Sequence, residues 1–156
     1  MSGFDLDLFL KNISHASNLD NSEVMIVWSI RHWINAPKNG ENPRELFRLS
    51  CEQQGVKDFS LLLDEISYCF KKATTDKSFI GGEFCNHLHL GELLILQSLF
   101  HIQNNNLNKA STVFERIFPI IWAKRIFKIL CTVSHFMEMA DLRLPYRKEY
   151  TSEKFH

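Results

Sequence analysis

Three residues with metal-binding side chains stand at every second position ahead of an apolar run, in the stretch FCNHLHLGELL. They are Cys85, His87 and His89, called the Cys-His cluster below. Alternate side chains of an extended segment project to the same side, so one thiol and two imidazoles can converge on a cation. Zinc favours thiolate and imidazole ligands in a tetrahedral arrangement. The spacing therefore raises the hypothesis of a zinc site, against the alternative of a loop and helix cap in which Cys85 is a small buried hydrophobe.

A tetrahedral site needs a fourth ligand, which the cluster itself does not contain. The candidates elsewhere in the chain are His101, His135, Cys69 and Glu92. Structural zinc sites usually hold two pairs of ligands separated by a loop, whereas here a single cluster must find its complement. The first interpretation is therefore a protein without a cofactor, and the alternative is a zinc-binding protein.

No motif in the sequence is typical of an enzyme. A nucleophilic thiol needs a neighbouring base, and Cys85 with His87 or His135 is the pair that the sequence offers. The segment IGGE, residues 80–83, lacks the lysine and the preceding strand that a phosphate-binding loop requires. We therefore expect a protein without catalytic residues.

The composition indicates one globular domain with no overall electrostatic preference. The chain has 156 residues, of which 45% are hydrophobic and 23% charged, close to the average for globular proteins. Lysine plus arginine equals aspartate plus glutamate, at 18 each. The chain as a whole is therefore not biased towards nucleic acid, anionic membranes or acidic substrates, and any such partner would need a local patch.

Three features of the sequence indicate a cytoplasmic protein without a membrane partner. The first residues include Asp5 and Asp7, where a secretory signal would carry lysine or arginine. The four cysteines are spread singly, without the spacing of a disulfide framework. The longest apolar run, residues 118–140, is interrupted by the cations Lys124, Arg125 and Lys128.

Hydrophobic periodicity predicts helices along most of the chain, with apolar residues recurring at i, i+3, i+4 and i+7. The predicted ranges are 21–36, 43–54, 58–73, 90–103, 107–118 and 120–142. The segment over 4–13 fits both the alternation of a strand and a helical face, and the helix is favoured. A capping box at Asp20 and Glu23 marks one start, and Gly55 marks one end. Residues 74–89, which include the Cys-His cluster, form the longest stretch without a helical period.

These helices predict an all-α fold, a single domain over residues 1–145 with a polar tail over 146–156. The helix over 120–142 is apolar on two sides, and its narrow polar stripe contains Lys124, Lys128 and His135. We expect about six helices packed around it as a central post. A face that self-associates is the alternative for this helix.

Tryptophan and cationic side chains are the candidate interaction residues. Trp33 follows Arg31 and His32, so it is either an exposed anchor or a core residue, and Trp122 lies on the last helix beside Lys124 and Lys128. Aromatic anchors are common at protein interfaces. The predicted function is a small protein-interaction or regulatory module that binds a partner protein or a second copy of itself.

Nucleic-acid binding is the second alternative function. The segment RLSCEQQGVKDFSLLLDEI has the spacing of a helix-turn-helix, but its second helix would present Asp58, Asp64 and Glu65 to the phosphates. A basic site at Lys124, Arg125 and Lys128, joined by Arg116, is the better candidate, although a few cations on a helix usually form a solvated face. Nucleic acid is therefore not the expected partner.

Four short motifs in the C-terminal part of the chain resemble those of a known group of proteins. They are Cys85 ahead of a helix, the helix start Gly91-Glu92-Leu93-Leu94, the short helix around Ala110, and the ending ADLRLP at residues 140–145. Over Cys85 to Pro145 the chain resembles a small family of uncharacterised, all-helical alphaproteobacterial proteins. The resemblance implies a helical fold and an intracellular bacterial setting, and it implies no reaction. The family has further cysteines at the positions of His87 and His89, so a shared metal role does not follow from it.

Overall fold

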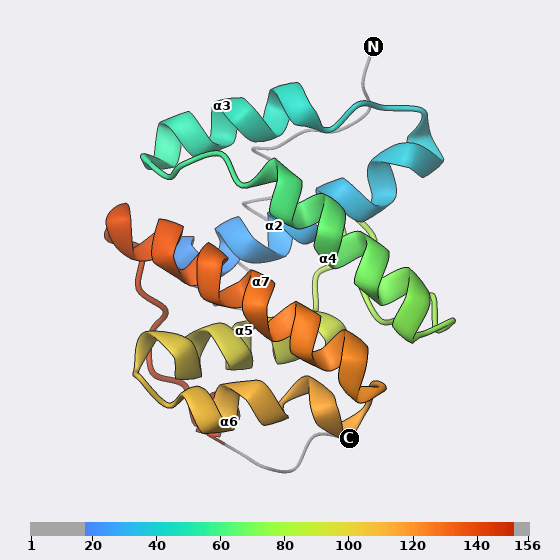
Figure 1. Ribbon diagram of the computed structural model, residues 1–156. Helices are drawn as coiled ribbons and strands as arrows, with labels where there is room; N and C mark the ends of the chain where they lie inside the picture. Colours follow the sequence, from blue (N-terminus) through green and yellow to red (C-terminus); the bar gives the residue numbers. More distant parts are fainter. Residues whose placement is uncertain (1–17, 152–156) are drawn as a thin grey trace.

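The computed structural model describes residues 18–151, which form seven α-helices and two short 3-10 helices and contain no strand. The elements, in chain order, are α2 (Asn21–Asn35), η1 (Ala36–Asn39), α3 (Arg44–Gln54), α4 (Ser60–Ala73), α5 (Leu90–Gln103), α6 (Leu107–Thr112), η2 (Phe114–Arg116), α7 (Ile120–Met139) and α8 (Lys148–Thr151) (Figure 1). The predicted all-α, single-domain fold is confirmed. The helical pattern over residues 4–13 lies outside the described residues.

The helix ends follow local side-chain chemistry. The backbone N–H of Asp20 donates to Glu23 Oε1 at 2.9 Å, which is one half of the predicted capping box. Gly55 ends α3 with φ at 71°, a conformation that glycine adopts without steric cost. Asp58 Oδ1 accepts a hydrogen bond from the backbone N–H of Ser60 at 2.9 Å, so α4 begins two residues later than predicted.

The centre of the fold is occupied by α2 and α5. Every residue from Ser22 to Trp33 on α2 is buried, and α5 packs against α2, α6, α7 and α8. The helix predicted as the central post, α7, lies in front of them in the view of Figure 1 and keeps one face exposed. As predicted, other helices pack against α7, namely α4, α5 and α6. Its exposed face is wider than the narrow polar stripe expected from the sequence, because Ile120, Ile121 and Thr132 are exposed together with the cations. No helix among residues 18–151 combines the length and the apolar character that a membrane span requires.

An aromatic cluster joins α2 to α3 and α4. The ring of Phe47 lies 6.1 Å from Trp28, 5.5 Å from Trp33 and 4.9 Å from Phe59, measured between centroids. Trp33 is only 6% exposed, and its indole N–H donates to Asp64 Oδ1 at 2.7 Å. Trp33 is therefore a core residue, and the alternative of an exposed anchor is wrong.

The segment over residues 146–151 packs against the folded domain. Tyr150 on α8 is 1% exposed, and Arg147 donates to the buried carboxylate of Glu23 through Nε at 2.6 Å and Nη2 at 2.7 Å. Burial and the nearby carboxylate raise the pKa of Tyr150, so its phenol stays protonated and donates to Glu23. The predicted polar tail is therefore wrong for residues 146–151, and residues 152–156 lie outside the described part.

Replacing Tyr150 with alanine tests this docking of the C-terminal segment. The change empties a buried site and removes a hydrogen-bond donor from Glu23, so we expect the free energy of unfolding to fall by about 3–5 kcal/mol in urea denaturation. Lys148→Ala, at an exposed position of the same short helix, is the matched control and should change it by less than about 0.5 kcal/mol. Equal, small effects of the two changes would show that α8 is not part of the domain.

Candidate metal centre

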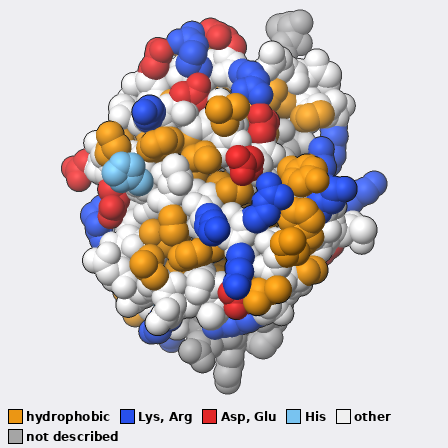
Figure 2. Space-filling model, in the orientation of Figure 1, with side chains coloured by type: hydrophobic (Ala, Val, Ile, Leu, Met, Phe, Trp, Pro, Cys, Tyr) orange, Lys and Arg blue, Asp and Glu red, His pale blue; other side chains and the backbone are white. Residues whose placement is uncertain are grey.

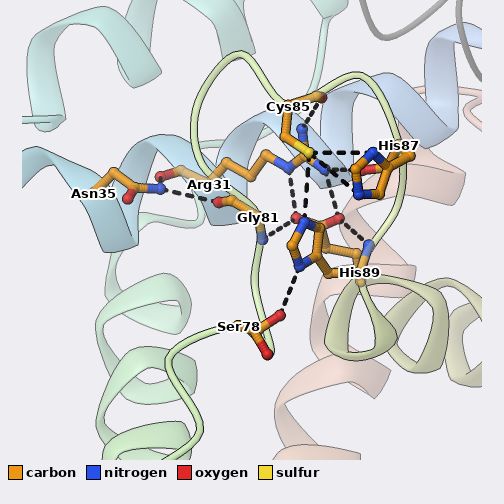
Figure 3. A network of polar contacts seen from close by, with 8 residues as sticks. Arg31, Asn35, Ser78, Gly81, Cys85, His87 and His89 are labelled. Carbon is orange, nitrogen blue, oxygen red and sulfur yellow. Dashed lines mark hydrogen bonds and ion pairs between the residues drawn. The ribbon is translucent and has the colours of Figure 1, made fainter.

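The loop between α4 and α5 brings the three members of the Cys-His cluster together. Cys85 Sγ lies 3.4 Å from His89 Nε2 and 3.6 Å from His87 Nδ1, and one ligand atom from each residue lies within 4.8 Å of the others (Figure 3). A tetrahedral zinc ion with bonds of about 2.3 Å to sulfur and 2.0 Å to nitrogen holds such atoms about 3.6 Å apart. The sulfur-to-nitrogen distances are therefore close to those between two ligands of one zinc ion. The two imidazoles are stacked with centroids 5.2 Å apart, so their rings would have to turn to direct both lone pairs at a shared ion.

The imidazole of His89 is oriented by a backbone carbonyl. His89 Nδ1 lies 2.6 Å from the carbonyl oxygen of Ser78, which can only accept, so Nδ1 carries the proton. In the neutral ring Nε2 is then the nitrogen with the lone pair, and it faces Cys85 Sγ. Metal-binding histidines commonly donate their second N–H to a carbonyl in this way. Although partial burial lowers the pKa of His89, the Ser78 carbonyl and the Cys85 sulfur outweigh it and raise that pKa.

Cys85 is the cysteine whose environment favours a thiolate. Partial burial raises its pKa, but the backbone N–H of His87, the side chain of His89 and the charge of Arg31 together lower it below the ordinary value. Burial instead raises the pKa of the other three cysteines, that of Cys51 to about 12 and those of Cys69 and Cys131 less far. Because the thiolate is the form that binds metal, Cys85 is the suitable ligand among the four.

A buried ion pair between α2 and α5 lies directly beneath this loop. The guanidinium of Arg31 and the carboxylate of Glu92 are both fully buried, and Arg31 Nη2 donates to Glu92 Oε1 at 2.7 Å. A second hydrogen bond joins Arg31 Nε to Glu92 Oε2, which makes the contact bidentate. The attraction within such a pair offsets the cost of removing both charges from water only when their remaining donors and acceptors are also hydrogen-bonded.

The backbone of the loop supplies those remaining partners. Arg31 donates to the carbonyl oxygens of Cys85 at 2.6 Å and His87 at 2.7 Å. Glu92 accepts from the backbone N–H groups of Gly81 at 2.9 Å and His89 at 2.8 Å. Figure 3 shows Arg31 reaching from its helix to the loop segment that carries the three ligands. The pair therefore holds one backbone group of each ligand residue, the carbonyl oxygens of Cys85 and His87 and the N–H of His89.

The close approach of Arg31 to the loop requires a glycine. A Cβ atom built on Gly81 would lie 2.7 Å from Arg31 Nη2, whereas one built on Gly82 meets nothing within 4 Å. Asn35, one turn further along α2, donates to the carbonyl oxygen of Gly81 at 3.2 Å. The loop is thus in direct contact with α2 at Gly81.

The fourth ligands suggested by the sequence are not brought to the cluster. Within residues 18–151 the group of metal-ligating side chains contains Cys85, His87 and His89 alone. Glu92 is engaged by Arg31, and Cys69 is fully buried in the core. His101 is buried 12 residues further along α5, about 18 Å of helix rise from His89, and His135 is exposed on α7. The fourth position is therefore left to water or to a ligand from outside the described residues.

Two residues that position the cluster were missed in the sequence. Arg31 had a signal, since it lies in the otherwise apolar segment VWSIRHWI and a cation there needs a buried partner. The sequence contains no signal for Ser78, because Ser78 orients His89 through its backbone carbonyl oxygen, which every residue carries.

The two adjacent glycines provide a matched test of the packing beneath the loop. Gly81→Ala forces its new methyl group against Arg31, so we expect a loss of about 1–3 kcal/mol in the free energy of unfolding. Gly82→Ala should change the value by less than about 0.5 kcal/mol, because the space around it is open. Urea denaturation of both variants checks this, and a Gly81→Ala variant as stable as Gly82→Ala would contradict the geometry.

Comparison with protein-family models, with curated protein sequences and with solved structures gave no match for this chain. The resemblance to the alphaproteobacterial family therefore stays a prediction, and the function has to be argued from the geometry described above.

Proposed function

We propose that the protein binds a zinc ion through Cys85 Sγ and the imidazoles of His87 and His89. The observation that carries the proposal is the convergence of these three ligand atoms within 4.8 Å of one another. The hydrogen bond from His89 Nδ1 to the Ser78 carbonyl supports it, since it leaves Nε2 available as the ligand atom. One thiolate with two imidazoles is a ligand set that suits zinc.

The consequence of binding is a fixed course for the loop between α4 and α5. Three ligands from one short segment, closed around a cation, would hold residues 85–89 against the Arg31–Glu92 pair. His87 is exposed, so the fourth ligand can come from water or from another molecule. We therefore regard the protein as a small helical module in which the metal organises a surface for interaction or regulation. A thiolate ligand also needs a reducing compartment, which agrees with the proposed cytoplasmic location.

The metal content of the purified protein tests the proposal. Prepared without a histidine tag and under reducing conditions, the full chain should contain about one zinc per molecule by elemental analysis. Cys85→Ser and His87→Ala should each lose most of it, because each removes one of three ligands.

Two variants of the same residue types serve as controls. Cys131→Ser and His135→Ala change a half-buried cysteine and an exposed histidine on α7 that are not part of the cluster. They should retain the zinc content of the unmodified chain. A chain that takes up no zinc from excess metal, or controls that lose as much as the cluster variants, would refute the proposal. If the analysis finds copper instead of zinc, the proposed metal site stands and the bound ion is copper.

A further inference from the structure

The outer surfaces of α4 and α7 form one apolar and basic area, called the α4–α7 face below. Its apolar side chains are exposed over 44–71% of their area, apart from the half-buried Trp122; they are Leu61, Tyr68, Ile117, Ile120, Ile121 and Trp122. Its exposed cations are Lys72, Lys124, Arg125 and Lys128. Figure 2 shows hydrophobic side chains over these two helices with lysine and arginine side chains around them.

Aromatic and cationic side chains fill the seam between the two helices. The rings of Tyr68 and Trp122 lie edge to face, with centroids 5.9 Å apart. The guanidinium of Arg125 lies 5.7 Å from the Tyr68 ring and 5.4 Å from the Trp122 ring, and Lys72 Nζ lies 5.6 Å from the Tyr68 ring. These side chains therefore fill the seam between the two helices.

The cations of this face have no carboxylate partner among the described residues. The ion pairs between described residues use Arg31, Arg44, Arg48, Arg143 and Arg147, and none uses a cation of the α4–α7 face. Glu65 is the exposed acid on this side of α4. The net charge of the face is therefore positive, although that of the chain is zero.

Three kinds of occupant fit this face poorly. A second copy in a two-fold dimer would bring the same cations against each other. A partner helix needs a groove for its apolar side, and the seam is filled. Nucleic acid would match the cations but would leave the exposed aliphatic side chains against phosphates and sugars.

We propose that the α4–α7 face binds the surface of a lipid bilayer that contains anionic lipids. Lysine and arginine side chains are attracted to anionic headgroups, and tryptophan and tyrosine favour the headgroup level of a bilayer. Three exposed isoleucines would enter the boundary between headgroups and acyl chains: Ile117, just before α7, and Ile120 and Ile121 at its start. The sequence indicated no membrane partner because a charge count over the whole chain averages out a local patch.

Cosedimentation of the full chain with vesicles tests the proposal. The probes are vesicles of phosphatidylcholine alone and vesicles in which about one third of the lipid is phosphatidylserine. We expect binding to the second kind only, weakened by salt. The double variant Lys124→Glu, Lys128→Glu should lower the apparent affinity at least about tenfold, because it reverses two of the four cations.

Matched variants separate this face from the rest of the surface. Lys38→Glu, Lys109→Glu makes the same charge change on η1 and α6, and it should stay within about twofold of the unmodified chain. Ile120→Ser, Ile121→Ser should reduce binding while keeping the net charge. All six positions are exposed, and circular dichroism can confirm that each variant stays folded.

Three results would overturn the proposal. The first is no binding to either vesicle at low salt. The second is an equal loss of binding in the Lys38 and Lys109 control. It would mean that the protein is attracted to anionic vesicles by its surface charge in general and not through the α4–α7 face. The third is a concentration-dependent dimer, seen by sedimentation, that the Ile120 and Ile121 variant abolishes, which would assign the face to self-association. Cys85→Ser should bind vesicles like the unmodified chain, so this result does not depend on the zinc site.

Discussion

The contact on which the fold and the site both depend is the buried pair between Arg31 and Glu92. Two full charges in the interior are unfavourable unless each of their nitrogen and oxygen atoms is bonded. Their bonds to each other, to two loop carbonyls and to two loop N–H groups meet that condition. The pair therefore holds the loop between α4 and α5 in one course, and that course brings the Cys-His cluster together. The geometry of the Cys-His cluster therefore depends on the hydrogen bonds that stabilise the buried Arg31–Glu92 pair.

The same arrangement recurs at the start of α2. Glu23 and Glu92 are each the third residue of a helix and bond back to the N–H of the residue before that helix, as in a capping box. Each is also fully buried and receives an arginine from a distant part of the chain, Arg147 for Glu23 and Arg31 for Glu92. One carboxylate thus caps its own helix and ties a second segment to it. This explains why α2 and α5, which carry the two acids, occupy the centre.

The sequence predicted the features that arise from contacts between residues close in the chain. It missed those that arise from contacts between residues far apart in the chain. The helices from α2 to α7 lie close to their predicted ranges because periodicity and caps are local signals. The capping role of Glu23 is a local signal, but its partner Arg147 lies 124 residues away, so the sequence alone predicts a polar tail over residues 146–156. The three ligand residues were named from their spacing, whereas Arg31 and the Ser78 carbonyl, which orient them, come from other turns of the fold.

The zinc affinity of the Glu92→Gln variant tests most directly whether the buried pair builds the site. Glutamine keeps the size of the side chain but removes the charge that holds Arg31 and reduces its capacity to accept from the loop. We expect a zinc dissociation constant about 10- to 100-fold higher than that of the unmodified chain, measured by competition with a coloured chelator, with the helical circular dichroism retained. An unchanged dissociation constant in a folded variant would contradict it, because the three ligands would then converge without the Arg31–Glu92 pair.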